Sequence, residues 1–543
     1  MSESFMGLNI AIRGLFTAQR SLDTVNHNLN NVNTPGYSRQ VSIQTAARPM
    51  ALYDGTGMMG TGSDVVGVQR VRDEYLDFKY WSENITMGEW TAKSEVLDDI
   101  EATFNEPSNS GFTTILSDFY NSLQELGKDP SSAAVRALVK QKGVTVAKYF
   151  NSVAAHFEKL QADVNYRIKT KVEEVNSYAT QIQQLNRQIY IAELDGSTAN
   201  DLRDSRTLLV DKISKIVNVE ANEVVAGKLP NGKDDKHFVL TISGKALVDH
   251  FEVSKLAVVQ RDASQKVNTE DVDGLYEVNW ADGNSLNIKG GELRGYLDVR
   301  DGNEGQTGPN GITSPEYKGI PYYQKKMNEF VRTFAMAFNE GYVDANGDGS
   351  IDPSAAAGEN LAGHADAFGL NGSTGIRFFT YTGADNKEAS SATFIGTATS
   401  PNDIYAKYSQ ITAKNFCVSS DIMTDYNKIG ISDVAGEAGN IKVLNSLLDM
   451  RHNPDMFAEG APEDFMKSLV ATMGIDSQQA QRYGANQNVI VKQIGNRRLA
   501  DSGVSMDEEM ANMVKFQQAY NASAKMIQTM GEIYDTLINK LFA

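Results

Sequence analysis

The segment DANGDGSIDPSA carries the side chains of this chain that are best suited to binding a metal ion. Its oxygen-bearing side chains fit the first nine positions of an EF-hand calcium loop: Asp344, Asn346, Asp348, Ser350 and Asp352. Such a loop is closed by a bidentate carboxylate at its twelfth position, where this chain has Ala355. We therefore expect a tight Asp/Gly turn, with weak Ca²⁺ binding as the alternative.

Two further patterns could suggest ligand binding, but neither has the context that ligand binding requires. Gly55, Gly57 and Gly60 spell a GxGxxG, but the following TGSDVVGVQRV alternates like a strand. A strand cannot offer a helix N-terminus to a pyrophosphate, so nucleotide binding is not predicted. The six histidines are scattered without an i, i+4 pair or an HExxH motif, which argues against a zinc site.

No arrangement of nucleophile and base is recognisable in the sequence. There is no G-x-S-x-G elbow and no Cys/His pattern. The acidic pairs Asp98-Asp99 and Glu508-Glu509 lie in helical segments, and the pair near Ser505 is typical of the negative charges that a helix N-terminus favours. We expect no enzymatic activity, no cofactor and no bound metal.

Composition limits the classes of partner. The 543 residues suffice for several domains, and 51 Lys+Arg against 69 Asp+Glu give a net charge of -18, which disfavours nucleic-acid binding. The single cysteine, Cys417, excludes an intrachain disulfide and is expected as a small buried residue in a strand. No secretory signal and no bilayer-length apolar stretch is found, so we expect no membrane insertion. An export route that reads an uncleaved terminus stays open.

Both ends of the chain carry the seven-residue periodicity of coiled-coil helices. The N-terminal seam consists of Leu8, Leu15, Leu22 and Leu29, interleaved with Ala11, Ala18, Val25 and Val32. The C-terminal seam consists of Met513, Tyr520, Ile527, Tyr534 and Leu541, with Met510, Gln517, Ala524, Gly531 and Ile538 predicted as its second register. We take these residues as the candidate assembly seam.

A rough energy comparison indicates that one such helix is not stable alone. Burying the leucines and two valines of the first seam yields about 9–18 kcal/mol, whereas ordering its backbone costs about 1–2 kcal/mol per residue. We expect termini that become ordered on self-assembly. An ordinary intramolecular helix pair that closes a domain is the alternative.

The interior alternates between helical and β-rich stretches, which predicts an α+β multidomain protein. A third seam runs from Val164 to Ala192 and indicates an elongated molecule, while strand and turn patterns begin near Val217. There the Ser-Gly turn within FVLTISGKALV predicts a hairpin. Strands are also predicted at IRFFTYT, ATFIGTAT and ITAKNFCV. The expected parts are a terminal coiled-coil domain (1–40 and 505–543), an elongated helical domain (41–216, 291–343 and 433–504), a β-rich module (217–290) and a β/loop-rich outer insertion (344–432).

Both termini resemble a known family. The opening GLNIAIRGLFTAQRSLDTVNHNLNNVNTPGYSRQ and the closing SGVSMDEEMANMVKFQQAYNASAKMIQTMGEIYDTLINKLF are similar to the terminal signatures of bacterial flagellar axial proteins. Three interior segments resemble the member of that family at the hook–filament junction: QIQQLNRQIYIAELDGSTANDLRDSRTLLVDKISKIVNV, GGELRGYLDVRDG and AFNEGYVDANGDG. Residues 358–432 match no pattern of the family that we can place.

The resemblance implies a structural component of the bacterial flagellum. It implies export through the flagellar type III apparatus, self-assembly into a ring whose inner tube is made by the termini, and contact with hook protein, hook-associated protein 3 and an export chaperone. It implies a secreted location at the hook–filament junction. The alternatives are another axial protein, such as hook-associated protein 3 or hook protein, or a secreted calcium-dependent adhesin.

Overall fold

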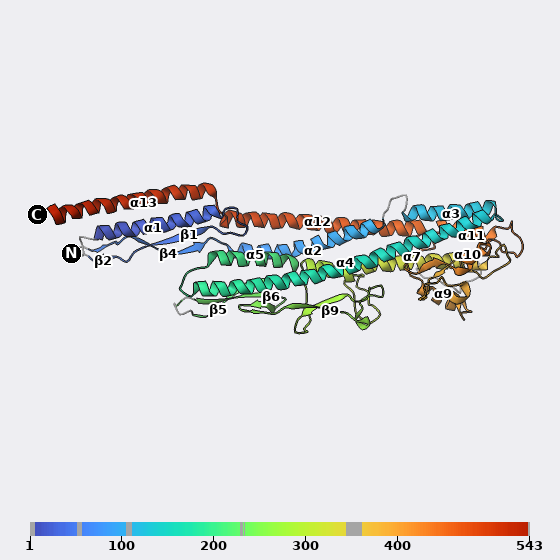
Figure 1. Ribbon diagram of the computed structural model, residues 1–543. Coiled ribbons are helices and arrows are strands. Elements are labelled where there is room, and N and C mark those ends of the chain that lie inside the picture. The colour runs from blue at the N-terminus through green and yellow to red at the C-terminus, as the bar shows by residue number, and fades with distance from the viewer. Residues whose placement is uncertain are drawn as a thin grey trace.

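The computed structural model describes residues 6–51, 57–104, 111–228, 232, 234–343 and 361–540 as an elongated rod (Figure 1). The fold is α+β with several parts, as predicted. Its longest element, α4 (Ala133–Glu193), has 61 residues and spans about 90 Å at 1.5 Å per residue. The helix contains the predicted seam but extends far beyond its N-terminal limit, because Ser132 caps the helix by accepting a hydrogen bond from the backbone N–H of Val135.

A bundle of helices forms the body of the rod around α4. The elements are α2 (Glu74–Phe104), α3 (Phe112–Lys128), α5 (Asn200–Ile216), α6 (Glu292–Asp301), α7 (Ile320–Glu340), α11 (Lys442–Asp449) and α12 (Pro462–Ser502). α12 runs along α2, and α5 and α6 also pack on α2. Val164, Ile168, Val175 and Ile182 of the predicted seam are buried. Helices from both halves of the chain therefore share one apolar core.

A β module lies along α4 (Figure 1). Four antiparallel strands lie side by side in chain order: β5 (Glu220–Lys228), β6 (Asp234–Ile242), β7 (Lys245–Asp249) and β8 (Glu252–Val253). The predicted turn between β6 and β7 is Ser243-Gly244, with φ of 49° and 88°, as a type I′ turn requires. A second ribbon pairs β9 (Leu256–Gln260) with β10 (Tyr276–Trp280).

The far end of the rod holds small elements: η2 (His364–Asp366), β11 (Phe379–Tyr381), α8 (Ser391–Ile395), α9 (Pro401–Lys407), η3 (Tyr408–Gln410), β12 (Phe416–Val418), α10 (Ser420–Thr424) and η4 (Tyr426–Lys428). Two predicted strands are found as the pair β11 and β12. The third prediction, a strand over ATFIGTAT, was wrong. The segment begins as the short helix α8, because Ser390 accepts the backbone N–H of Thr393 and caps a turn.

At the other end of the rod the two termini lie together (Figure 1). α1 (Met6–Asn30) and α13 (Met506–Asp535, followed by the π turn η6, Thr536–Lys540) run side by side. The strands β1 (Gln40–Ala46) and β4 (Ser63–Arg70) form an antiparallel pair that packs on α1, with β2 (Met50–Ala51) and β3 (Met58–Met59) near the tip. The strands β1 and β4, which we had expected in the helical domain, thus lie against the terminal helix α1 instead.

Candidate functional site

The terminal helices α1 and α13 form an antiparallel pair with matching seven-residue steps. A Cβ atom at Gly7 would lie 2.6 Å from Met530 Cε, and one at Gly14 would lie 3.0 Å from Ser523 Oγ. Further along, Asn28 Nδ2 donates to Glu509 Oε2 at 3.1 Å. Seven residues toward the C-terminus of α1 therefore correspond to seven residues toward the N-terminus of α13. The small side chains on α1 allow the close approach of α13.

The predicted seam residues of α1 lie on the flank of this contact. Leu8, Leu15, Leu22 and Leu29 are partly buried, whereas Ala11, Ala18 and Val25 of the second register are buried. On α13, Met513, Tyr520, Ile527 and Tyr534 are partly buried, and Leu541 lies outside the described residues. The structure therefore brings the two sets into one helix pair.

Most residues of the second register predicted for α13 are exposed in the isolated subunit, and only Ala524 is partly buried. Met510 and Ile538 are more than half exposed, and Gln517 and Gly531 are exposed. Their place is taken by residues one position earlier: Glu509, Phe516, Ser523 and Met530. Either set completes a heptad pattern with the Met513 series, so periodicity on α13 alone cannot distinguish them. The missed signal lies on α1, where Gly7, Gly14, Ser21 and Asn28 recur at the same step.

Large apolar side chains of α13 are exposed on both sides of its seam. Val514 follows the seam residue Met513 by one position, and Met526 precedes the seam residue Ile527 by one. At 3.6 residues per turn these neighbours lie about 100° around the helix in opposite directions. Val514 is 57 % exposed and Met526 is 51 % exposed. One partner helix therefore leaves two apolar flanks of α13 uncovered.

Polar contacts join α1 to the β1–β4 pair. The Thr17 hydroxyl donates to the carbonyl oxygen of Ser63 at 2.9 Å, and the hydroxyls of Ser21 and Ser42 are also 2.9 Å apart. Asn28 Nδ2 donates to the backbone carbonyl of Gln40 at 2.8 Å. α1 is therefore held between the hairpin on one side and α13 on the other.

A neck, formed by residues 31–39, 71–73 and 503–505, connects the terminal helices to the body. The N–H of Arg39 donates to the carbonyl of Ser502 at 2.7 Å, which links the first segment of the neck to the end of α12. The carboxylate of Asp204 on α5 accepts the Ser38 N–H at 2.7 Å and its hydroxyl at 2.9 Å. Arg70 pairs with the same buried carboxylate at 2.8 Å.

A second group of charged side chains lies next to Asp204. Arg72 donates twice to Asp77, at 2.7 and 2.8 Å, and Arg498 of α12 pairs with Asp77 at 2.9 Å and with Asp211 at 3.1 Å. Trp81 Nε1 donates to Asp211 at 2.6 Å. Burial raises the pKa of Asp211, and Arg498 opposes this effect. Since both signs are represented and hydrogen-bonded, the cluster holds the neck in one orientation.

The acidic residues at the start of α13 have more than one partner. Glu508 and Glu509 lie in the first turn, where Ser505 accepts a bond from the N–H of Glu508, as predicted for a helix N-terminus. In addition, Arg39 pairs with Glu508 at 2.7 Å, and the Glu509 side chain is buried against Asn28. Sequence reasoning missed both contacts because their partners lie more than 450 positions away.

Within the described residues, the other sequence motifs form parts of the fold and not ligand sites. TGSDVVGVQRV contains strand β4, as predicted. Cys417 is buried in β12 near the Thr380 hydroxyl, as predicted for a small core residue. Across the described ranges, no group of three His, Cys, Asp or Glu side chains is placed to hold a metal. The DANGDGSID loop lies outside the described residues.

Three family models match the chain. The flagellar hook-associated protein FlgK helical domain covers residues 97–350, the flagellar basal body rod FlgEFG protein C-terminal model covers residues 496–541, and the flagella basal body rod protein model covers residues 8–37. The two rod-protein models therefore match the helix pair, and the helical-domain model matches much of the body.

Curated relatives match over nearly the whole length. Flagellar hook-associated protein 1 of Bacillus subtilis is 29 % identical over 99 % of both chains, and its Escherichia coli counterpart is 28 % identical over 98 % of this chain and 99 % of its own. This chain belongs to the flagellar hook-associated protein 1 family. It is a structural component of the bacterial flagellum. None of the helices in the described part of the chain has the length and apolar composition needed to span a bilayer.

A solved member supports the fold of this hook-associated protein. The flagellar hook junction protein FlgK from Burkholderia pseudomallei superimposes with a TM-score of 0.52 at 14 % identity, covering 80 % of this chain and all of the other. At that identity the likeness concerns the fold alone.

Proposed function

We propose that this chain joins the flagellar hook to the filament as a junction subunit and that it assembles through its terminal helices. The observation that carries the proposal is the pair of exposed apolar flanks on α13, to either side of the face that α1 covers. Burying a single Met, Val or Ile side chain stabilises a contact by about 1.5–3 kcal/mol. Neighbouring copies on both flanks would remove these side chains from water.

The partners follow from this geometry and from the family. We infer a ring of identical subunits whose inner tube is formed by α1 and α13. Hook protein on one side and hook-associated protein 3 on the other are the axial partners. An export chaperone is the partner inferred before assembly. The body, the β module and the far end of the rod project from that tube, while the β1–β4 pair stays with the terminal helices.

We further propose that the chain has no catalytic role. The thiol of Cys417 is buried, and burial raises its pKa, so the reactive thiolate is disfavoured. Its neighbour Thr380 is buried as well. The neck carboxylates Asp77, Asp204 and Asp211 are paired with arginines. These features support a scaffold role.

The assembly proposal can be tested on α13 without disturbing the monomer. Val514→Asp places a charge on an exposed flank, so the folded subunit should be exported at the wild-type level. We expect hooks without filaments and flagellin shed into the medium, because an interface cannot bury an unpaired carboxylate without a cost of several kcal/mol. Electron microscopy of negatively stained cells and immunoblots of the medium measure both results.

Gln518→Asp is the matched control, since Gln518 is an exposed polar residue of the same helix. It introduces the same charge one turn away and points opposite to the seam. Met526→Asp tests the second flank and should behave like Val514→Asp. Normal filaments in both flank variants would overturn the assembly role of α13.

A further inference from the structure

Two histidines of the β module are stacked against each other, His250 buried and His237 partly exposed. His250 follows β7 in the left-handed region, with φ of 48°, and is 7 % exposed. The ring of His237 on β6 lies parallel to it, with centroids 3.9 Å apart and an angle of 5°. Neither ring nitrogen of His250 has a hydrogen-bond partner among the described residues. The buried ring therefore has no hydrogen-bond acceptor for the N–H that a second proton would create.

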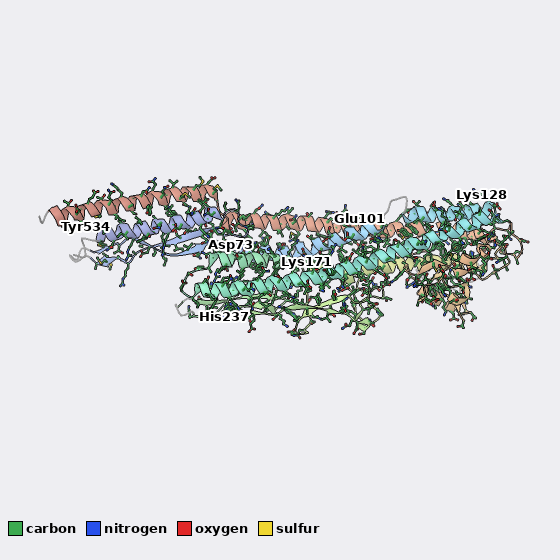
Figure 2. The ribbon with its side chains drawn as sticks, viewed as in Figure 1. Asp73, Glu101, Lys128, Lys171, His237 and Tyr534 are labelled. Carbon is green, nitrogen blue, oxygen red and sulfur yellow. The ribbon has the colours of Figure 1, made fainter. Side chains whose placement is uncertain are left out.

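The stacked pair lies where the β module is fastened to α4; Figure 2 labels His237 on this module beside the helix. Asn186 of α4 donates to the backbone carbonyl of His250 at 2.8 Å, and Gln183 donates to that of Phe251 at 2.6 Å. The Tyr190 ring meets the rings of His250 and Phe251 edge to face, at 5.9 and 5.4 Å. The turn between β7 and β8 is thus one point at which the β module is attached to α4, and Asn176 bonded to Leu256 of β9 is another.

The charged groups around the pair come from every element packed there. Arg206 of α5 is buried over Phe238 and donates to Asn186, and Glu223 of β5 pairs with it. Burial lowers the pKa of His250, His237 lowers it further, and Asp235 opposes the shift. The remaining titratable or charged neighbours are Lys236 on β6, Asp249 on β7, Glu252 on β8, Arg187, Tyr190 and Glu193 on α4, and Arg203 on α5.

We propose that the stacked His237–His250 pair is an acid-sensitive latch that holds the turn between β7 and β8 on α4 at neutral pH and releases it on protonation. Two neutral imidazoles stack favourably. Two protonated rings at this spacing repel each other, and buried Arg206 adds a third positive charge. Because the family acts outside the cell, the pH of the medium reaches this latch directly.

Hydrogen exchange of the full-length chain tests the proposal. Protection factors, corrected for intrinsic exchange rates, should fall at least about tenfold between pH 7.5 and pH 5.0, which corresponds to one unit of difference in proton affinity. The fall should be confined to β7, β8 and the facing turns of α4 around Gln183 and Asn186. In His250→Phe, which retains an aromatic ring and cannot be protonated, these amides should keep their protection at pH 5.0.

His156→Gln is the control, because His156 is an exposed histidine of the same helix and should leave the response unchanged. His237→Gln provides a second route if His250→Phe does not fold. Removing the neighbouring charge should then reduce the response of the same amides. An equal loss of protection in wild type and His250→Phe, an unreduced response in His237→Gln, or no response in wild type would each overturn the latch.

Discussion

His364 shows how a buried residue of the far module makes stability depend on pH. Its Nδ1–H donates to the carbonyl of Ile376 at 2.7 Å, and its Nε2 accepts the N–H of Gly430 at 2.9 Å. Both bonds suit the neutral ring, and a second proton would break the one to Gly430. Burial lowers the pKa of His364 to about 4 from an ordinary value of 6.5, and the cations Arg136 and Arg377 contribute to this shift.

The residue-scale prediction concerns His364. Because the folded pKa is depressed, its contribution is complete above pH 6.5 and is lost as the pH falls toward 4, by about 3 kcal/mol in total. Hydrogen exchange of the segments around Ile376 and Gly430 measures the free energy of opening over that range. His364→Gln should flatten the pH profile of these segments, and an unchanged profile would contradict the assignment.

At the scale of elements, the packing of α1 on α13 depends on glycines, which have no side chain. Gly7 and Gly14 occupy positions where a Cβ would approach Met530 or Ser523 within 3.0 Å. Glycine normally weakens a helix by about 1 kcal/mol relative to alanine. Its presence at two heptad-related positions of α1 is explained by the close approach of the partner helix.

The prediction at this scale is that Gly14→Leu separates the two helices. The larger side chain has no room against Ser523, and overpacking of this kind costs about 1–3 kcal/mol. Protection of α1 and α13 amides against hydrogen exchange should fall in the isolated subunit. Gly531→Leu is the matched control, since no atom lies within 4 Å of a Cβ at Gly531 and α13 should keep its protection. Equal protection in both variants would argue against the register.

At the scale of the whole molecule, the terminal helix pair extends from one end of the rod and is joined to the body at the neck, with further contacts from His27 and Gln40 to Asp201 of α5. Figure 2 shows Tyr534 near the tip of this extension and Asp73 where it joins the body. The body has a continuous apolar core, whereas the residues of the α13 seam are only partly buried. The two ends of the molecule should therefore differ in stability.

We accordingly predict that limited proteolysis of the isolated subunit removes the terminal helices first. From the sequence, the stable core should begin after about Arg39 and end before about Ser505. The structure moves the expected N-terminal limit to about residue 71, because the β1–β4 pair rests on α1 and loses its support when α1 is cleaved. Mass spectrometry of the fragments defines both limits. A subunit cut first within the body, with both helices intact, would refute this order.

Patterns confined to one segment could be interpreted without a structure. Helical periodicity predicted α1, α13 and the C-terminal half of α4, and the Ser243-Gly244 turn predicted the β6–β7 hairpin, because both depend on neighbours within a few residues. The family resemblance in the two termini likewise lies in continuous stretches. ATFIGTAT failed because its β-branched composition is outweighed by the cap at Ser390, a single hydrogen bond.

Contacts between distant segments were decided by the tertiary structure alone. Which residue completes the α13 seam depends on the glycines of α1, and Ser38 meets Asp204 across 166 positions. The His237–His250 stack likewise forms only when β7 pairs with β6. A heptad pattern indicates that a helix packs against a partner, but it does not specify the shape or the charge of that partner. The sequence by itself therefore determined the elements and the family, while packing across the fold decided the register, the neck and the histidine pair.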